Sequence, residues 1–255
     1  MVGRPVALTA KDRSLRLAER SFYTTPLTPC PYLPGHLEQR LVTFLEPGDA
    51  GSLLNALNQI GFRRSQSMAY RPICPGCNAC VPVRIPVDAF EPGRNLRKVL
   101  SRNEAIGWTE RPKRITREQF ELFHRYLNVR HPEGGMAEMT FGDYARMVED
   151  DPSPGSLVEF REDGRLIAVS LTDRLNDGLS GVYKFYEPDL ERRSLGTFVI
   201  LWHVSRARQL GLPFVYLGYW IEGSPKMAYK ARFRPLERLT RAGWVPFGDG
   251  KPAAR

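Results

Sequence analysis

The amino-acid sequence predicts an α+β protein. A small cysteine-containing region, residues 1–92, precedes a larger domain, residues 93–255, that we expect to form a mixed, largely antiparallel sheet flanked by helices. Three patterns support this: prolines and cysteines punctuate the first part, apolar residues recur at helical spacing in the middle, and alternating β-type runs separated by turn residues follow. A chain of 255 residues buries a sizeable core without disulfides.

Composition places the chain among globular proteins outside membranes. Hydrophobic residues make up 42% of it, and the longest apolar run, residues 197–202, is far shorter than the roughly 20 residues that a membrane span requires. The first residues contain no apolar stretch of the length of a secretory signal. We therefore expect a cytoplasmic protein, in which cysteines are thiols or metal ligands rather than disulfides.

The formal charge of +9 is unevenly distributed. Ten basic residues face four acidic ones over 94–130, the balance reverses to three and ten over 133–173, and 226–241 holds six basic residues and one acidic. Two basic segments separated by an acidic one suggest a positive surface that suits a phosphate backbone. The alternative is that these charges line ordinary solvated helix faces.

Local patterns define the elements of the first region. Four prolines between residues 21 and 46 predict an extended or turning segment. Apolar residues at helical spacing between Gly51 and Gly61 predict a short amphipathic helix that ends at Gly61. Residues 81–87 alternate as in a strand, and its two prolines predict a place at the edge of a sheet.

The larger domain begins with helices and continues with strands. Residues 95–106 predict a basic helix, Thr116 with Gln119 forms a capping box that begins a second, and Thr140 with Asp143 begins a third. The later elements are a meander of three strands at 157–160, 166–173 and 179–188, a helix at 194–210, a strand at 214–219 and a helix at 224–232. This order is that of a GNAT-like acyltransferase domain, which narrows the chemistry to acyl transfer onto an amine.

A phosphate-binding turn of GNAT acetyltransferases has only a partial match. Residues 193–196 supply the Arg and Gly of the pattern, but the bulky Phe198 stands where a small residue is required. This argues against a coenzyme pyrophosphate. The alternative is that Arg192, Arg193 and Ser194 begin and cap a helix.

The sharpest local motif is a cysteine cluster. Cys74, Cys77 and Cys80 lie within seven residues around a Pro-Gly turn, so that three thiolates could converge on one ion, with Cys30 as a fourth ligand. Zinc or an iron–sulfur cluster suits such ligands; packed, reduced thiols are the alternative. No Cys–His pair suggests a nucleophile, and the scattered histidines, His203 among them, we take as structural.

Several longer segments carry a resemblance to a known family. They are TPCPYLP at 28–34, GFRRS at 61–65, YRPIC with CNACVPVR at 70–84, VYKFYEP at 182–188, RSLGT at 193–197, and YW at 219–220 through KMAYKARFRP at 226–235. Over nearly the whole chain the sequence resembles the N-end-rule aminoacyl-tRNA–protein transferases, and in length it resembles their short bacterial aspartate/glutamate leucyltransferases.

The resemblance implies a reaction and its partners. Leucine would pass from leucyl-tRNA to the N-terminal Asp or Glu of an acceptor protein, which the proteolytic machinery then recognises; arginyl-tRNA is the nearest alternative donor. No cofactor is required for this chemistry, although the family's clustered cysteines imply a structural zinc or iron–sulfur site. Here the first cluster contains only Cys30, where eukaryotic members have two cysteines.

The sequence shows no nucleophile motif, and this reaction needs none, because an aminoacyl ester is already activated for attack by an amine. The enzyme must align two substrates, accept a proton and stabilise an oxyanion. We expect Tyr219, Glu222, Lys226 and Tyr229 beside the cleft where a GNAT-like sheet splays, with Glu222 or a phenol as the proton acceptor.

Basic residues are the candidates for binding both substrates. Guanidinium groups pair with carboxylates through two hydrogen bonds, so the candidates for an acidic acceptor residue are Arg63, Arg64, Arg71 and Arg84. The candidates for tRNA are Arg97, Lys98, Arg102, Lys184, Lys230 and Arg232. Two rival hypotheses are an acetyl-CoA-dependent N-acetyltransferase and an RNA-binding protein with a structural zinc knuckle.

Overall fold

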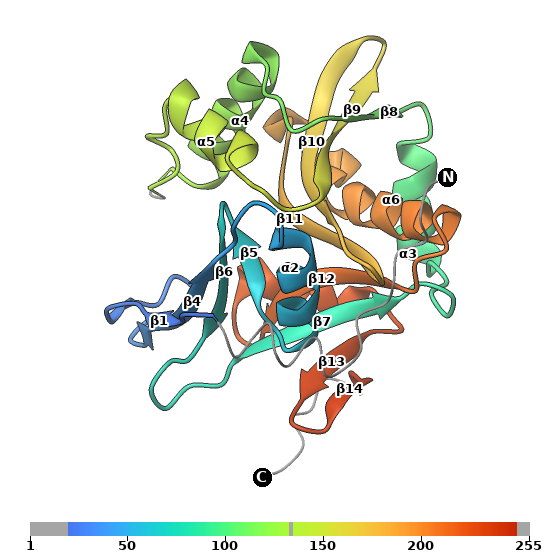
Figure 1. Cartoon of the computed structure of the whole chain (residues 1–255). Helices are drawn as coiled ribbons and strands as arrows, with labels where there is room; N and C mark the ends of the chain where they lie inside the picture. Colours follow the sequence, from blue (N-terminus) through green and yellow to red (C-terminus); the bar gives the residue numbers. More distant parts are fainter. Residues whose placement is uncertain (1–19, 133–134, 249–255) are drawn as a thin grey trace, which may run out of the picture.

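A computed structural model describes residues 20–132 and 135–248, in which an eight-stranded sheet forms the centre of the molecule (Figure 1). The strands of this sheet, in spatial order, are β14 (Gly243–Pro246), β13 (Glu237–Thr240), β7 (Cys80–Pro86), β12 (Phe214–Ile221), β11 (Gly178–Tyr186), β10 (Arg165–Arg174), β9 (Gly155–Glu162) and β8 (Gly107–Arg111). Of these described strands, β11 and β12 pair in parallel and the other neighbours are antiparallel. The predicted α+β class and the GNAT-like order of elements are therefore confirmed.

A second, smaller sheet lies on the side of the molecule opposite α6 (Figure 1). Its strands, in spatial order, are β1 (Tyr23–Thr24), β4 (Arg40–Phe44), β6 (Met68–Pro72) and β5 (Arg63–Ser65), and a separate hairpin consists of β2 (Thr28–Pro29) and β3 (Leu37–Glu38). Helix α2 (Ala50–Gln59) packs Leu53 and Leu57 against this sheet and against Tyr216 of β12. Gly61, with φ of +88°, turns the chain out of the helix, as the sequence predicts.

Helices cover both faces of the large sheet. They are α3 (Arg94–Arg102), α4 (Arg117–Arg130), α5 (Phe141–Glu149), α6 (Leu195–Gln209), the short α7 (Pro225–Ala228), and the 3₁₀ turns η1 (Pro188–Arg193) and η2 (Tyr229–Arg232). One core lies under α3 and α6 and a second under α4 and α5. The capping box predicted at Thr116 with Gln119 is present, and Thr140 with Asp143, predicted to begin a helix, forms a second one. The helix predicted over 224–232 is instead α7 followed by η2.

Strand β7 corrects one prediction. It is an interior strand between β12 and β13, not an edge strand. Its prolines are tolerated because β13 pairs only with Val83 and Arg84, which leaves Pro82 and Pro86 outside that ladder. Because β7 precedes residue 92 and pairs with strands that follow it, both parts of the chain build the same sheet; the division at residue 92 stays a prediction.

The predictions about a secretory signal and about a membrane span concern different parts of the chain. The N-terminal stretch to which the first one applies lies within residues 1–19, outside the described residues. Over 20–132 and 135–248, none of the helices has the length and apolar character needed to cross a membrane.

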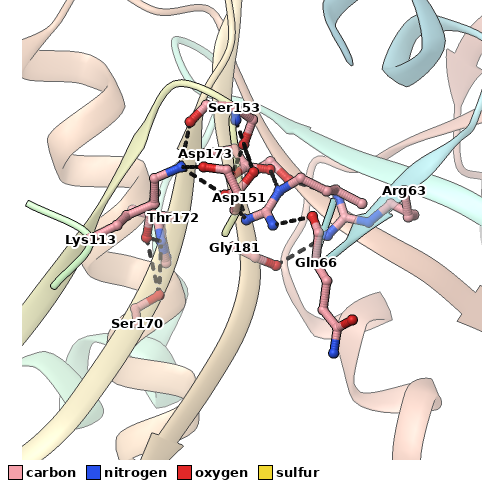
Figure 2. A network of polar contacts seen from close by, with 12 residues as sticks. Arg63, Gln66, Lys113, Asp151, Ser153, Ser170, Thr172, Asp173 and Gly181 are labelled. Carbon is pink, nitrogen blue, oxygen red and sulfur yellow. Dashed lines mark hydrogen bonds and ion pairs between the residues drawn. The ribbon is translucent and has the colours of Figure 1, made fainter. Parts of the chain in front are cut away.

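A buried charge network joins the two sheets (Figure 2). The guanidinium of Arg64, on β5, donates from Nε and Nη2 to the carboxylate of Asp173, on β10, at 2.8 and 2.7 Å. Its Nη2 also lies 3.0 Å from Asp151 Oδ2, which accepts from Lys113 Nζ at 2.8 Å. The side chains of Arg64, Asp151 and Asp173 are at most 1% exposed. Burial opposes the charged guanidinium, but the two carboxylates outweigh burial and raise the pKa of Arg64.

We expect Arg64→Met to lower the free energy of unfolding by about 3–5 kcal/mol, because it leaves two carboxylates buried with less compensating charge. Urea denaturation monitored by circular dichroism measures the change. Arg71→Met is the matched control, since Arg71 is exposed and its guanidinium donates only to the Ile60 carbonyl among the hydrogen bonds of the described residues. Equal losses in the two variants would contradict the role given to the network.

Candidate active site

The parallel pair β11–β12 opens along its length. Pairing joins Gly178, Leu179 and Ser180 to residues 214–216 and then stops, although β11 continues to Tyr186 and β12 to Ile221. The register of β12 against β7 also shifts between Tyr216 and Gly218. We call the region from Gly181 on β11 and Gly218 on β12 onward the strand opening. The sequence predicts the splay directly after the strand over 214–219, near Gly223 and Pro225, whereas the pairing of β11 with β12 already ends at Ser180 and Tyr216.

Arg63 enters the strand opening from β5 of the small sheet. Its Nη1 donates to Ser180 Oγ at 2.9 Å and its Nη2 donates to the Gly181 carbonyl at 3.1 Å. Gly218 has φ of +76°, and a Cβ there would lie 3.0 Å from Arg63 Nε. A glycine is therefore required at 218 both by its backbone conformation and by the close approach of the guanidinium.

Two lysines complete a group of three cations at this place. Lys230, in η2, is buried, and its Nζ donates to the Tyr219 carbonyl and, at 3.2 Å, to Met227 Sδ. Lys184, on β11, donates to Tyr229 Oη at 3.5 Å. Burial, and then the charges of Arg63 and Lys184, hold the pKa of Lys230 well below its usual range. We call Arg63, Lys184 and Lys230 the cation cluster.

The four predicted catalytic residues separate into two pairs. Tyr219 is buried, and its hydroxyl donates to the carbonyls of Gly61 at 2.8 Å and Tyr70 at 3.3 Å, while burial raises its pKa. Tyr229 is half-buried, and its ring centroid lies about 6 Å from both lysine Nζ atoms. Glu222 and Lys226 are exposed beyond the end of β12. All four lie after Gly218 in the chain, and their catalytic roles stay predictions.

Of the four arginines predicted to bind the acceptor, only Arg63 reaches the strand opening. Arg64 is occupied by its buried carboxylates, and Arg71 is exposed on β6. Arg84 Nε donates to Glu237 Oε2 at 2.7 Å, and its guanidinium lies 3.4 Å from the centroid of the Phe214 ring. The expectation that Arg64 and Arg84 are free to bind an acceptor is therefore corrected, because each is already paired with a carboxylate inside the protein.

The predicted tRNA-binding residues also divide by position. Arg97, Lys98 and Arg102 are exposed along α3, and Arg232 is exposed at the end of η2, so these four stay candidates for phosphate contacts. Lys184 and Lys230 instead belong to the cation cluster, and the burial of Lys230 removes it from any surface that a tRNA backbone could touch. This corrects the prediction for Lys230.

The four cysteines gather near one another. Burial, followed by the proximity of Cys74, Cys30 and Cys77, raises the pKa of the Cys80 thiol to about 12. Four thiols are chemically suitable for zinc or an iron–sulfur cluster. In the described residues, however, no three Cys, His, Asp or Glu side chains have an arrangement that could hold a metal ion. A metal site stays a prediction, and no step of the reaction is derived through it.

The turn before α6 does not cap that helix, although the sequence offered helix capping by Arg192, Arg193 and Ser194 as an alternative. Ser194 has φ of 55°, and its side chain makes no capping hydrogen bond. Arg193 forms an ion pair with Glu162 and donates from Nε to Asn103 Oδ1 at 3.0 Å. A Cβ at Gly196 would lie 3.0 Å from Tyr186 Cε1. Arg193 therefore ties this turn to α3 and β9 instead of capping α6.

Sequence reasoning did not single out Ser180, Gly181 or Gly218. The signal was present at Gly218, because a glycine within an apolar strand often marks a bulge or a close backbone approach. His203, which the sequence predicts to be structural, lies on α6 beneath Gly181, where a Cβ would be 3.4 Å from His203 Cε1. Its Nε2 is 2.9 Å from Thr172 Oγ1.

The pH dependence of stability tests the burial of His203. Burial lowers its pKa from 6.5 to about 3, so the unfolded chain takes up a proton first as the pH falls. The contribution of the neutral ring is complete above pH 6.5 and declines below it by up to about 1.4 kcal/mol per pH unit. We expect His203→Gln to flatten the loss of unfolding free energy between pH 6.5 and 4.5, measured by urea denaturation. Identical slopes for both proteins would contradict this.

Known proteins share sequence and fold similarity with this chain. Two family models match the chain: "Arginine-tRNA-protein transferase, N terminus" over residues 28–98 and "Arginine-tRNA-protein transferase, C terminus" over residues 118–240. Among solved structures, L-PGS from Bacillus licheniformis has a TM-score of 0.46 at 13% identity and covers 73% of this chain and 56% of its own.

Two curated relatives are named aspartate/glutamate leucyltransferase. The relative from Parvibaculum lavamentivorans is 56% identical over 88% of this chain and 93% of its own length. The relative from Paramagnetospirillum magneticum is 52% identical over 91% of this chain and 96% of its own length. The chain therefore belongs to the aminoacyl-tRNA–protein transferase family that includes the aspartate/glutamate leucyltransferases, and it is a transferase.

Proposed function

We propose that this protein transfers leucine from leucyl-tRNA to the α-amine of proteins whose N-terminal residue is Asp or Glu. The observation that carries the proposal is the cation cluster at the strand opening, where a substrate with a negative charge beside its amine would be held. The names of the relatives agree with this donor and acceptor. The product would enter N-end-rule degradation in the cytoplasm, where aminoacyl-tRNA is used.

The reaction depends on the alignment of its two substrates and needs no covalent intermediate on the enzyme. The acceptor nitrogen bonds to the carbonyl carbon of the aminoacyl ester, the bond from that carbon to the ribose oxygen breaks, and the proton lost by the amine ends on the ribose oxygen. Holding both substrates in one geometry supplies much of the rate. A developing oxyanion is stabilised by nearby hydrogen-bond donors and positive charge.

Transfer of labelled amino acid tests the proposal directly. Purified protein is mixed with tRNA charged with labelled leucine or arginine, and with peptides that differ only in an N-terminal Asp, Glu or Ala. We expect label to move from leucyl-tRNA to the Asp and Glu peptides alone. Arginyl-tRNA is the second donor tested because both matching family models are named for arginine-tRNA-protein transferases.

Other outcomes of this experiment have defined meanings. Transfer from arginyl-tRNA alone would keep the reaction and overturn the donor. Equal transfer to the Ala peptide would overturn the acceptor. No transfer, with charged tRNA shown to be intact, would overturn the proposal; acetyl transfer from acetyl-CoA, or tRNA binding without turnover, would then favour the two rival hypotheses.

The exposed cations of α3 make a separate prediction about the donor. We expect Arg97→Ala with Lys98→Ala to weaken tRNA binding and to reduce the slope of log affinity against log salt by about 1 for each phosphate that is no longer neutralised. Filter binding at several salt concentrations measures the slope. Arg174→Ala is the control, because Arg174 is exposed at the end of β10 and away from α3 in sequence. An unchanged slope would remove α3 from the tRNA interface.

A further inference from the structure

The small sheet has one covered face and one open face. Residues that lie directly opposite each other on paired strands point to the same side of a sheet, and successive residues of a strand alternate between sides. Leu41 and Ala69 point toward α2 and belong to the core beneath that helix. The alternate positions point to the other side, and we call them the open face: Tyr23, Val42, Phe44, Met68 and Tyr70.

The open face is apolar and lies outside the cores of the protein. Tyr23 is 53% exposed and Phe44 is 51% exposed, and their ring centroids are 6.2 Å apart. Nine large apolar side chains are exposed in the described part of the chain, and six of them lie between residues 23 and 73. No residue of the open face takes part in the three apolar clusters that the described residues form. A concentration of exposed apolar side chains is typical of a surface that binds another molecule.

The open face leads to the strand opening. Arg63, which reaches the strand opening from β5, lies directly opposite Tyr70 and therefore on the same side of the small sheet. Tyr70 packs beside Tyr219 of β12, with ring centroids 6.2 Å apart. The row of side chains from Arg63 to Tyr23 crosses three strand spacings, about 14 Å, which an extended polypeptide covers with about four residues. A chain that begins in the strand opening can therefore lie along the open face.

The two substrates of the proposed reaction need different surfaces. A tRNA backbone is attracted to exposed cations, and those of α3 lie on the opposite side of the molecule from the small sheet (Figure 1). None of the five residues of the open face is charged. Arg40, whose guanidinium lies over the Tyr70 ring, is already paired with Glu38. The open face is therefore better suited to the acceptor, a protein whose chain must leave the strand opening across the surface.

We infer that the open face binds the polypeptide that follows the acceptor's N-terminal residue and that it favours apolar side chains over about the next four residues. The inference rests on the proposed function, because that function supplies a protein as the acceptor. The strand opening receives the first residue, and the open face adds affinity from the residues behind it. An acceptor that ends after two residues cannot reach this surface.

The experiment separates the open face from the strand opening by the length of the acceptor. Three acceptors begin with Asp-Ala: the dipeptide amide, an octapeptide with Leu at positions 3–5, and the same octapeptide with Ser at those positions. We expect kcat/KM of the wild-type protein for the Leu octapeptide to be about tenfold above the values for the other two, because apolar side chains become buried. Phe44→Ser should remove most of this preference by raising KM for the Leu octapeptide, with KM for leucyl-tRNA and kcat/KM for the dipeptide unchanged.

Phe141→Ser is the matched control, because Phe141 is an aromatic residue on α5 that is 39% exposed and lies outside the small sheet. It should keep the preference of the wild type. Tyr23→Ser is a second variant of the open face and should lower the same preference. Thermal unfolding identifies any variant that does not fold, and the folded one of Phe44→Ser and Tyr23→Ser then decides the test.

Three kinetic results would overturn the inference. The first is an equal kcat/KM of the wild-type protein for the two octapeptides, which needs no variant. The second is an unchanged preference in a folded variant of the open face. The third is a raised KM for leucyl-tRNA with the preference intact, which would assign the open face to tRNA.

Self-association is the other possible use of an apolar face. Analytical ultracentrifugation of the wild type and of Phe44→Ser tests it: a dimer that becomes a monomer while the peptide preference is kept would overturn the inference. Failure of the proposed function is distinguishable, because the wild-type protein would then transfer leucine to none of the peptides. Fluorescence anisotropy with the labelled octapeptides still tests the surface in that case, since the open face binds the Leu octapeptide more tightly than the Ser octapeptide.

Discussion

The bidentate pairing of Arg64 with Asp173 is the interaction on which the position of the site depends. It joins β5 of the small sheet to β10 of the large one, and among the described strands no ladder pairs one sheet with the other. Adjacent residues of a strand point to opposite sides, so fixing Arg64 also fixes the direction of Arg63. Arg64 is paired with a carboxylate of the large sheet, and its neighbour Arg63 enters the strand opening.

A buried ion pair is weak support for stability in general, because the desolvation of the charges offsets their attraction. Here the ion pair contributes by fixing the positions of the residues around it. Asp151 and Lys113 extend the pairing to the segments before β9 and after β8, and Ser153 Oγ donates to Asp151 at 2.6 Å, so the carboxylates are held from several elements (Figure 2). An apolar contact of similar size would hold the sheets together without specifying the direction of Arg63.

The strand opening combines features that oppose stability. Gly218 adopts a left-handed conformation, the ladder between β11 and β12 ends early, and three basic side chains lie together, of which Lys230 is buried. Binding sites often contain such destabilising features, and the stability of the rest of the fold must compensate for them. The two apolar cores on opposite faces of the large sheet provide that support.

Local patterns in the sequence determined the helices with capping boxes, the β meander and the order of the later elements, because these depend on contacts between near neighbours in the chain. The tertiary structure alone decided that β7 is an interior strand, because its partners β12 and β13 come more than 100 residues later. It also decided which of the neighbouring basic residues are paired internally. Arg64 and Arg63 are indistinguishable by type and spacing, and only the carboxylates brought in from β10 and the segment before β9 separate their roles.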